Sequence, residues 1–265
     1  MEANIYQIDG KTEKKIELPH VFAKEFRVDL VRRAIHAEQS LRFQPQGHYA
    51  LAGMQTSAAY IGEYSTWRTG RHMGQAIRPR QKLAAGAQGE VRRIPSAKKG
   101  KRAHPHMPEK ILIERINASE YRKALESAIA GTSKHDLIAQ RFSDKLASIP
   151  IIIDNKIESI AQTKDLMKIL NGLGIGSDLE KSHDPKLRKG LRRSIRRRIF
   201  RKSALIVVKD ASKIGKAGRN IPGVDVIGVD SLTVESIAPG AIPRVTIFSE
   251  NAIKGLHDAI AKAKL

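Results

Sequence analysis

Ala204-Leu205-Ile206-Val207-Val208 is a run of five apolar residues with no polar position between them. A short continuous run of this kind is typical of a strand that is buried on both of its faces. Comparable runs occupy residues 149–153, 224–229 and 245–248. Helical patterns separate the runs, at 163–173, at a short helix that Ser177 would cap, at 231–237 and at 251–262. The alternation predicts an α/β fold, doubly wound, with a mostly parallel sheet flanked by helices.

The earlier part of the chain adds four further elements. Residues 4–8 alternate apolar and polar side chains, which predicts a short edge strand. Apolar residues recur at three- and four-residue spacing over 21–41, which predicts one amphipathic helix. Asn117, with Glu120 three residues later, predicts a capping box that opens the next helix. A further helix is expected over 135–147.

Residues 44–107 show neither the three- and four-residue spacing of a helix nor the alternation of a strand. They contain eight glycines and scattered single apolar residues. A loop of this length inside a compact domain is uncommon unless it is functional or lacks a fold of its own. We therefore expect a globular α/β domain made of residues 1–43 and 108–265, into which residues 44–107 are inserted as an extended basic loop.

Charge is distributed unevenly along the 265 residues. The 48 Lys and Arg against 27 Asp and Glu give a net charge of +21 at pH 7. Residues 42–106 hold twelve Lys or Arg against two acids, and residues 186–202 hold ten with no acid at all. The remainder of the chain is almost neutral. Charge segregated in this way predicts a polyanionic partner.

Several classes of protein are disfavoured by composition. No run of about 18 apolar residues is present, and the first residues lack the features of a signal peptide, so we expect a cytoplasmic protein without a membrane partner. The basic stretches lack the apolar face of an interfacial helix, which leaves nucleic acid as the polyanion. Cysteine is absent, and with it disulfides and thiolate chemistry.

No motif predicts a cofactor, a metal site or an enzymatic activity. The glycines at 172–176 follow a helix rather than a strand, and those at 215–218 lack the spacing of a phosphate-binding loop. His104 and His106 stand two apart with no cysteine near them, which makes a poor zinc site.

Two rival functions remain open. An RNA-modifying enzyme with a Rossmann-like core would need a glycine-rich turn after the strand at 149–153, where Asp154-Asn155-Lys156 stands instead. A free-standing nucleic-acid regulator would leave a loop of some sixty residues unexplained.

Aromatic rings and cations alternate in the loop, and this pattern suits RNA. Rings stack on unpaired bases while guanidiniums contact phosphates. In the segment 186–202, apolar residues spaced by four predict a face that rests on the sheet: Leu187, Leu191, Ile195 and Ile199. The RNA-binding residues expected in the loop are Tyr49, Tyr60, Tyr64, Trp67, Arg68, Arg71, Arg78, Arg80, Lys82, Arg92, Arg93, Lys98, Lys99, Lys101, Arg102 and His104. Those expected in the segment are Lys186, Arg188, Lys189, Arg192, Arg193, Arg196, Arg197, Arg198, Arg201 and Lys202.

Several motifs resemble one known family. Residues 47–58 (GHYALAGMQTSA) resemble the start of the extended loop in the universal L-four family of large-subunit ribosomal proteins. The return arm is similar at 92–95 (RRIP) and 100–105 (GKRAHP), and the C-terminal half at 218–225 (GRNIPGVD), 238–240 (APG) and 246–250 (TIFSE). The absence of a long C-terminal tail is typical of the archaeal type.

The resemblance implies a structural constituent of the large ribosomal subunit. It implies that the protein binds large-subunit (23S) ribosomal RNA through the loop and the basic segment. It also implies neighbouring large-subunit ribosomal proteins as partners. The loop tip, expected around residues 67–80, would help to line the polypeptide exit tunnel and would meet the nascent polypeptide there.

Overall fold

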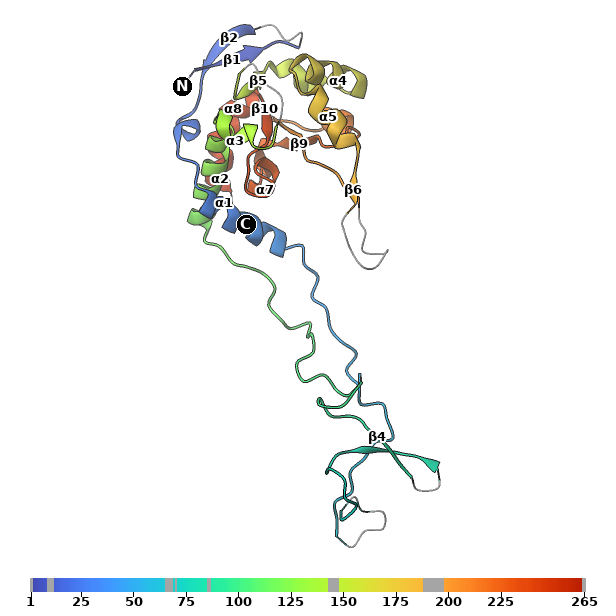
Figure 1. Cartoon of the computed structure of the whole chain (residues 1–265). Coiled ribbons are helices and arrows are strands. Elements are labelled where there is room, and N and C mark those ends of the chain that lie inside the picture. Colours follow the sequence, from blue (N-terminus) through green and yellow to red (C-terminus); the bar gives the residue numbers. More distant parts are fainter. Residues whose placement is uncertain are drawn as a thin grey trace. The chain divides into compact units, whose positions relative to one another are not determined.

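The chain forms two compact units that are described separately. A computed structural model describes residues 2–8, 12–64, 69, 71–84, 87–142, 148–187 and 198–263 (Figure 1). By internal contacts, residues 1–42 and 113–265 make up one unit, here called the globular unit. Residues 43–112 make up the other, here called the inserted unit.

A six-stranded sheet is the centre of the globular unit. Its strand order is β2-β1-β5-β10-β8-β9. The pair β1–β2 is antiparallel, whereas the neighbours from β1 through β9 are parallel. The strands span Glu2–Tyr6 (β1), Thr12–Glu17 (β2), Ile151–Ile153 (β5), Ala204–Val208 (β8), Asp225–Gly228 (β9) and Val245–Ser249 (β10). The mostly parallel sheet of the sequence prediction is confirmed.

The sheet is buried on both faces because successive strand residues point to opposite sides. Leu205 and Val207 join one apolar cluster, whereas Ala204, Ile206 and Val208 join a second. The first cluster includes residues of α1 (Val28–Ser40), α2 (Ala118–Gly131), α7 (Val234–Ile237) and α8 (Glu250–Lys262). The second includes residues of α3 (His135–Ala139), α4 (Thr163–Gly172), α5 (Gly176–His183) and α6 (Ile214–Gly218). Short 3-10 helices complete the unit at His20–Ala23 (η1), Asn155–Ser159 (η3) and Val229–Ser231 (η5).

The prediction of a single helix over 21–41 is wrong. The structure has η1, then an irregular stretch, and α1 begins only at Val28. The backbone between them is held by α2, because Ser127 Oγ accepts from Arg27 N at 2.7 Å and donates to the Glu25 carbonyl at 3.2 Å. Local periodicity cannot predict this interruption, since Ser127 lies about a hundred residues further along the chain.

Two predicted helix starts also differ from the structure. Asn117 stands at the N-cap of α2 without a side-chain cap, and Glu120 instead pairs with Arg33 at 2.9 Å. The short helix that Ser177 was expected to cap is α5, and it begins one residue earlier, at Gly176. Of the helix expected over 135–147, α3 accounts for 135–139, and residues 143–147 lie outside the described part of the chain.

Glu38, near the end of α1, joins three helices. Its side chain is buried, and it accepts hydrogen bonds from the Tyr121 hydroxyl (2.6 Å) and from the backbone N–H groups of Val234 (2.8 Å) and Glu235 (2.8 Å). The carboxylate therefore caps the N-terminus of α7, where a negative charge is favourable. Burial raises the pKa of Glu38, although the hydrogen bonds act in the opposite direction. Burial also raises the pKa of Tyr121.

Replacement of this carboxylate tests the helix junction. We expect Glu38→Ala to lower the free energy of unfolding by about 2–4 kcal/mol, because two buried donors and one part-buried donor lose their acceptor. Tyr121→Phe, which removes only one of the donors, should cost about 1 kcal/mol. Urea unfolding followed by circular dichroism measures both values. Equal stability of Glu38→Ala and wild type would contradict this role.

Wild type and Glu38→Ala can also be compared as a function of pH. In the unfolded chain Glu38 has its ordinary pKa of 4.5, whereas in the folded protein its pKa is raised. Between these two pKa values the folded protein keeps a proton on Glu38 that the unfolded chain has lost. The contribution of Glu38 is therefore greatest below pH 4.5 and declines as pH rises through the raised pKa. The stability advantage of wild type over Glu38→Ala should shrink over that interval. An advantage that grows with pH there would contradict the raised pKa.

Candidate nucleic-acid interface

The inserted unit contains a short hairpin that its sequence pattern did not predict. Strands β3 (Arg80–Lys82) and β4 (Gln88–Val91) pair antiparallel, with Arg80 opposite Val91 and Lys82 opposite Gln88. An isolated bridge joins Ala59 to Arg80. The strands are too short to show a periodic pattern in the sequence. The hairpin is visible in Figure 1 around the β4 label.

Glycine allows two turns of the inserted unit to approach each other closely. Gly53 adopts φ +78°, and a Cβ at this position would lie 2.4 Å from the carbonyl carbon of Gly100. A Cβ on Gly100 would lie 1.9 Å from the carbonyl oxygen of Ile94. Further along, His48 contacts the His106 carbonyl through its backbone N–H (3.2 Å) and its ring Nδ1 (3.0 Å). The outgoing and returning parts of the insertion are therefore in direct contact.

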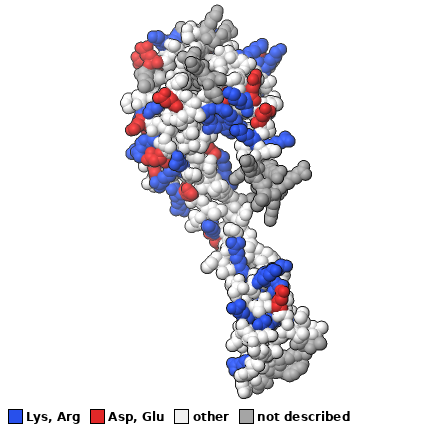
Figure 2. All heavy atoms as spheres, in the orientation of Figure 1, with Lys and Arg blue, Asp and Glu red and all other residues white. Residues whose placement is uncertain are grey.

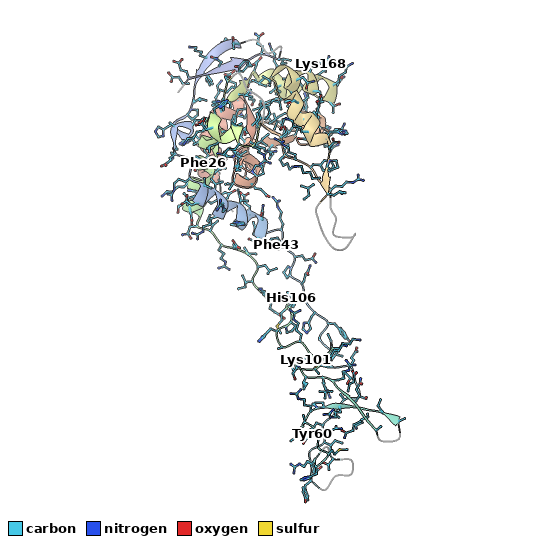
Figure 3. The ribbon with its side chains drawn as sticks, viewed as in Figure 1. Phe26, Phe43, Tyr60, Lys101, His106 and Lys168 are labelled. Atoms are coloured by element: carbon cyan, nitrogen blue, oxygen red, sulfur yellow. The ribbon has the colours of Figure 1, made fainter. Side chains whose placement is uncertain are left out.

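The tyrosines expected to contact RNA are exposed. Tyr49 is 58% exposed and its hydroxyl accepts from Gln55 Nε2 at 2.8 Å. Tyr64 is 77% exposed and meets His72 edge to face, with ring centroids 6.4 Å apart. Tyr60, labelled in Figure 3, is 37% exposed. Trp67 and Arg68 lie outside the described residues.

Most cations expected in the loop also have exposed side chains, and on the face drawn in Figure 2 they outnumber the acids of the same unit. Arg80 and Arg92 are half-buried. Arg92 is engaged within the unit, with Nη2 2.5 Å from Glu90 and Nη1 donating to the Lys98 carbonyl at 2.7 Å. The exposed members are Arg71, Arg78, Lys82, Arg93, Lys98, Lys99, Lys101, Arg102 and His104.

Three of the residues in this unit hold a left-handed backbone that side chains disfavour. His72 has φ +58°, Arg93 has φ +75° and Lys99 has φ +58°. Such conformations are uncommon for residues other than glycine, and surrounding contacts must maintain them. Two of the three are cations whose side chains are exposed.

The basic segment 186–202 begins and ends in a two-stranded pair. Strand β6 (Lys186–Leu187) lies antiparallel to β7 (Arg198–Ile199). Leu187 is 63% exposed and Ile199 is 50% exposed, so the expectation that these two residues rest on the sheet is wrong. Both residues belong instead to the β6–β7 pair. The expected RNA contacts Arg188, Lys189, Arg192, Arg193, Arg196 and Arg197 lie outside the described residues, as do Leu191 and Ile195.

The last two cations of the segment are paired with acids of the globular unit. Arg201 Nη2 lies 2.7 Å from Asp178, and Lys202 Nζ lies 2.7 Å from Asp225. Asp225 also pairs with the fully buried Arg244 at 2.7 Å. Burial acts to raise the pKa of Asp225, but the hydrogen bonds and charges of Lys202 and Arg244 hold it below its ordinary value.

The glycine-rich stretches have structural positions. Gly172 ends α4, Gly174 has φ +80° in the connection to α5, and the glycines at 215 and 218 lie in α6. Strand β5 is followed by Asp154 and η3 rather than by a glycine-rich turn. Within the described ranges, no three His, Asp or Glu side chains gather as metal ligands. No helix in the described parts of the chain is both long and apolar enough to cross a membrane.

The contact between the two turns of the inserted unit can be tested with alanine. Gly53→Ala should separate the turns, because the new Cβ would overlap the Gly100 backbone and because φ is positive. The amides of Met54, Ala97 and Gly100, which are hydrogen-bonded within these turns, should exchange with deuterium about tenfold faster or more.

Gly74→Ala is the matched control for that measurement. Gly74 also has a positive φ, of +65°, but a Cβ there meets nothing within 4 Å. This variant should leave exchange of the three amides unchanged. Equal exchange in Gly53→Ala and wild type would show that the turns do not depend on the close approach.

The chain is similar to known ribosomal proteins along nearly its whole length. A family model described as "Ribosomal protein L4/L1 family" matches residues 16–259. A protein of Archaeoglobus fulgidus named large ribosomal subunit protein uL4 is 38% identical over 261 residues, which cover 97% of this chain and 99% of that protein. Proteins of the same name are 38% identical in Methanoregula boonei, over 96% of this chain and 98% of that protein, and in Methanococcus vannielii, over 97% and 99%. The chain therefore belongs to the ribosomal protein L4/L1 family.

Proposed function

We propose that the protein is a structural constituent of the large ribosomal subunit and binds large-subunit ribosomal RNA. Its relatives in archaea carry the name of a large-subunit protein, and the chain aligns with them over nearly its whole length. Membership of a ribosomal protein family gives it a structural role in the ribosome. Its location is then the ribosome in the cytoplasm, with neighbouring large-subunit proteins as further partners.

The excess of exposed cations in the inserted unit is the observation that carries the RNA-binding proposal. The inserted unit, residues 43–112, contains twelve Lys or Arg and only three acids. Nine of the sixteen expected loop contacts are described cations or a histidine with exposed side chains. Phosphates neutralise such an excess, and the release of their counterions favours association.

The aromatic residues support the same partner. Tyr49, Tyr60 and Tyr64 expose their rings within the unit that carries these cations. Bases of single-stranded RNA stack on rings of this kind, and the adjacent guanidiniums contact the backbone. We include Trp67 and Arg68 among the RNA contacts on sequence alone. No observation favours an enzyme: β5 lacks the glycine-rich turn that a Rossmann-like core requires.

The end of the inserted unit is proposed to line the polypeptide exit tunnel and to meet the nascent polypeptide. The described part of the expected tip contains a cavity of about 490 Å³ lined by Tyr60, Arg71, His72, Met73, Gly74, Gln75 and Ile77. Met73 is 50% exposed and Ile77 is 70% exposed. Apolar and cationic side chains together suit a wall that faces both RNA and a passing peptide.

The RNA-binding proposal can be tested through salt dependence. Lys98, Lys99 and Lys101 are exposed. Replacing these three with Gln should weaken binding to large-subunit ribosomal RNA and lower the slope of log affinity against log salt by about 2–3. Filter binding over a range of salt concentrations measures the slope.

A triple variant of the globular unit serves as the control. Lys156, Lys168 and Lys254 lie in ion pairs with Asp154, Asp165 and Glu250. Their replacement with Gln removes the same charge and should leave the slope nearly unchanged. If both variants lower the slope equally, binding is a general charge effect and the proposed interface is wrong.

The tunnel proposal can be tested by photo-crosslinking. A photoreactive amino acid at position 77, incorporated into large subunits, should crosslink to a radiolabelled nascent chain of suitable length. The same group at Lys168 of the globular unit (Figure 3) should not crosslink. Failure at position 77, in subunits shown to contain the protein, would reject the tunnel contact without affecting the RNA-binding proposal.

A further inference from the structure

Two acids of the globular unit, the buried Asp178 and the half-buried Asp225, hold the C-terminal end of the basic segment. The described parts of that segment include the pair β6–β7, in which Leu187 lies opposite Arg198. From β7 the chain passes through Arg201 and Lys202 into β8. Sequence alone placed both cations among the RNA contacts, yet both side chains reach carboxylates of their own globular unit.

Asp178 is the more deeply buried of the two acids. It lies in α5 and is 2% exposed. Its Oδ2 accepts from Ser203 Oγ at 2.5 Å, and its Oδ1 lies 2.7 Å from Arg201 Nη2. Among the described residues, Oδ1 accepts no hydrogen bond of good geometry, so the Arg201 charge is what compensates it. A buried carboxylate without such compensation is strongly disfavoured.

This contact links the two ends of the basic segment. Helix α5 ends at His183, three residues before β6 begins, so Asp178 belongs to the element that leads into the segment. Arg201 and Ser203 belong to the stretch that leads out of it. The Asp178 contacts therefore join the two stretches of chain between which the β6–β7 pair lies.

Arg141 also contacts the end of the basic segment. Its carbonyl accepts a hydrogen bond from Arg201 Nη2. Its own guanidinium donates to the carbonyls of Lys202 (3.2 Å) and Pro239 (2.6 Å). The stretches around Arg141 and Arg201 thus each donate a side chain to the other's backbone.

Lys202 forms a second anchor on the next strand. Its Nζ donates to both carboxylate oxygens of Asp225 in β9, at 2.7 and 2.9 Å. Asp225 is fixed in turn by Arg244, which is 1% exposed and donates through Nε to the Ser236 carbonyl at 2.7 Å. The second anchor therefore has a rigid base within the protein core.

We propose that Asp178 and Arg201 are positioning residues that fix the β6–β7 pair, with its exposed cations Lys186 and Arg198, in place for RNA. The inference rests on the proposed function and assigns Arg201 to an ion pair within the globular unit rather than to a phosphate. Lys202 and Asp225 act in the same way. A pair that is already ordered binds more tightly, because less conformational freedom is lost on association.

A phosphate contact and an ion pair with Asp178 are the two possible roles of Arg201. They predict opposite changes in RNA affinity for the substitution Asp178→Asn. If Arg201 contacted phosphate, Asp178→Asn would remove a competing negative charge and tighten RNA binding. If Asp178 instead positions the segment, the same substitution weakens binding, by about tenfold if one or two more residues must be ordered. The assay is filter binding of the full-length protein to transcribed large-subunit ribosomal RNA at fixed salt, well below the melting temperature.

Asp184→Asn is the matched control. It removes the same charge two residues before Lys186, from a side chain that is 96% exposed. Binding should be unchanged or slightly tighter in this variant. Tighter binding of Asp178→Asn, or binding equal to wild type, overturns the proposal.

A double-mutant cycle makes the test independent of one variant. Arg201→Gln should weaken binding, and adding Asp178→Asn to it should change affinity by less than about twofold, because the contact is already lost. Renewed tightening in the double variant would assign Arg201 to phosphate. Thermal melts confirm that each variant is folded. If Asp178→Asn does not fold, Ser203→Ala removes one hydrogen bond alone and should weaken binding about threefold; unchanged binding overturns the proposal.

Failure of the proposed function gives a different result. The wild-type protein would then bind large-subunit ribosomal RNA no more tightly than an unrelated transcript of equal length. A wild type that prefers ribosomal RNA, combined with an Asp178→Asn variant that binds equally well, would reject only the positioning role.

Discussion

Burial of the central strands on both faces is the constraint on which the globular unit depends. Leu205 and Val207 point into one apolar cluster while Ile206 and Val208 point into the other, so helices must cover both sides of the sheet. Loops and helix ends then gather around the rim of the sheet. The acids that pair with the basic segment are located there: Asp178 on α5, and Asp225 on β9, the edge strand. The packing of apolar strands thus decides where charges can be paired.

Charge has two different uses in this protein. In the globular unit, cations such as Arg244 and Arg201 are matched by carboxylates, and burial makes each pair sensitive to the loss of one partner. In the inserted unit the acids are too few to match the cations, and most of the described cations have exposed side chains. Pairs of the first kind hold the protein together, whereas the unmatched excess suits a polyanion outside it. A count of charges along the sequence does not separate the two uses, because pairing depends on residues far apart in the chain.

The parts of the fold that sequence reasoning missed were decided by distant residues. The helix expected over 21–41 is interrupted because Ser127 binds the backbone at Glu25 and Arg27. The capping box at Asn117 does not form because Glu120 pairs with Arg33. In the inserted unit, the β3–β4 hairpin is too short to show a period, and the Gly53–Gly100 contact joins turns almost fifty residues apart. The prediction that the glycines at 172–176 follow a helix rather than a strand was right, because Gly172 ends α4.

The sequence by itself determined the α/β class, the mostly parallel sheet and the family, because continuous apolar strands, alternating helices and several long motifs are local properties of the chain. It also determined that two stretches carry nearly all of the excess positive charge. Only the tertiary structure decided which cations are available to a partner. Arg201, Lys202 and Arg92 look like their neighbours in sequence, but each meets an acid in the folded protein. The reason is physical: the strength of an ion pair depends on distance and burial, and both arise only when the chain has folded.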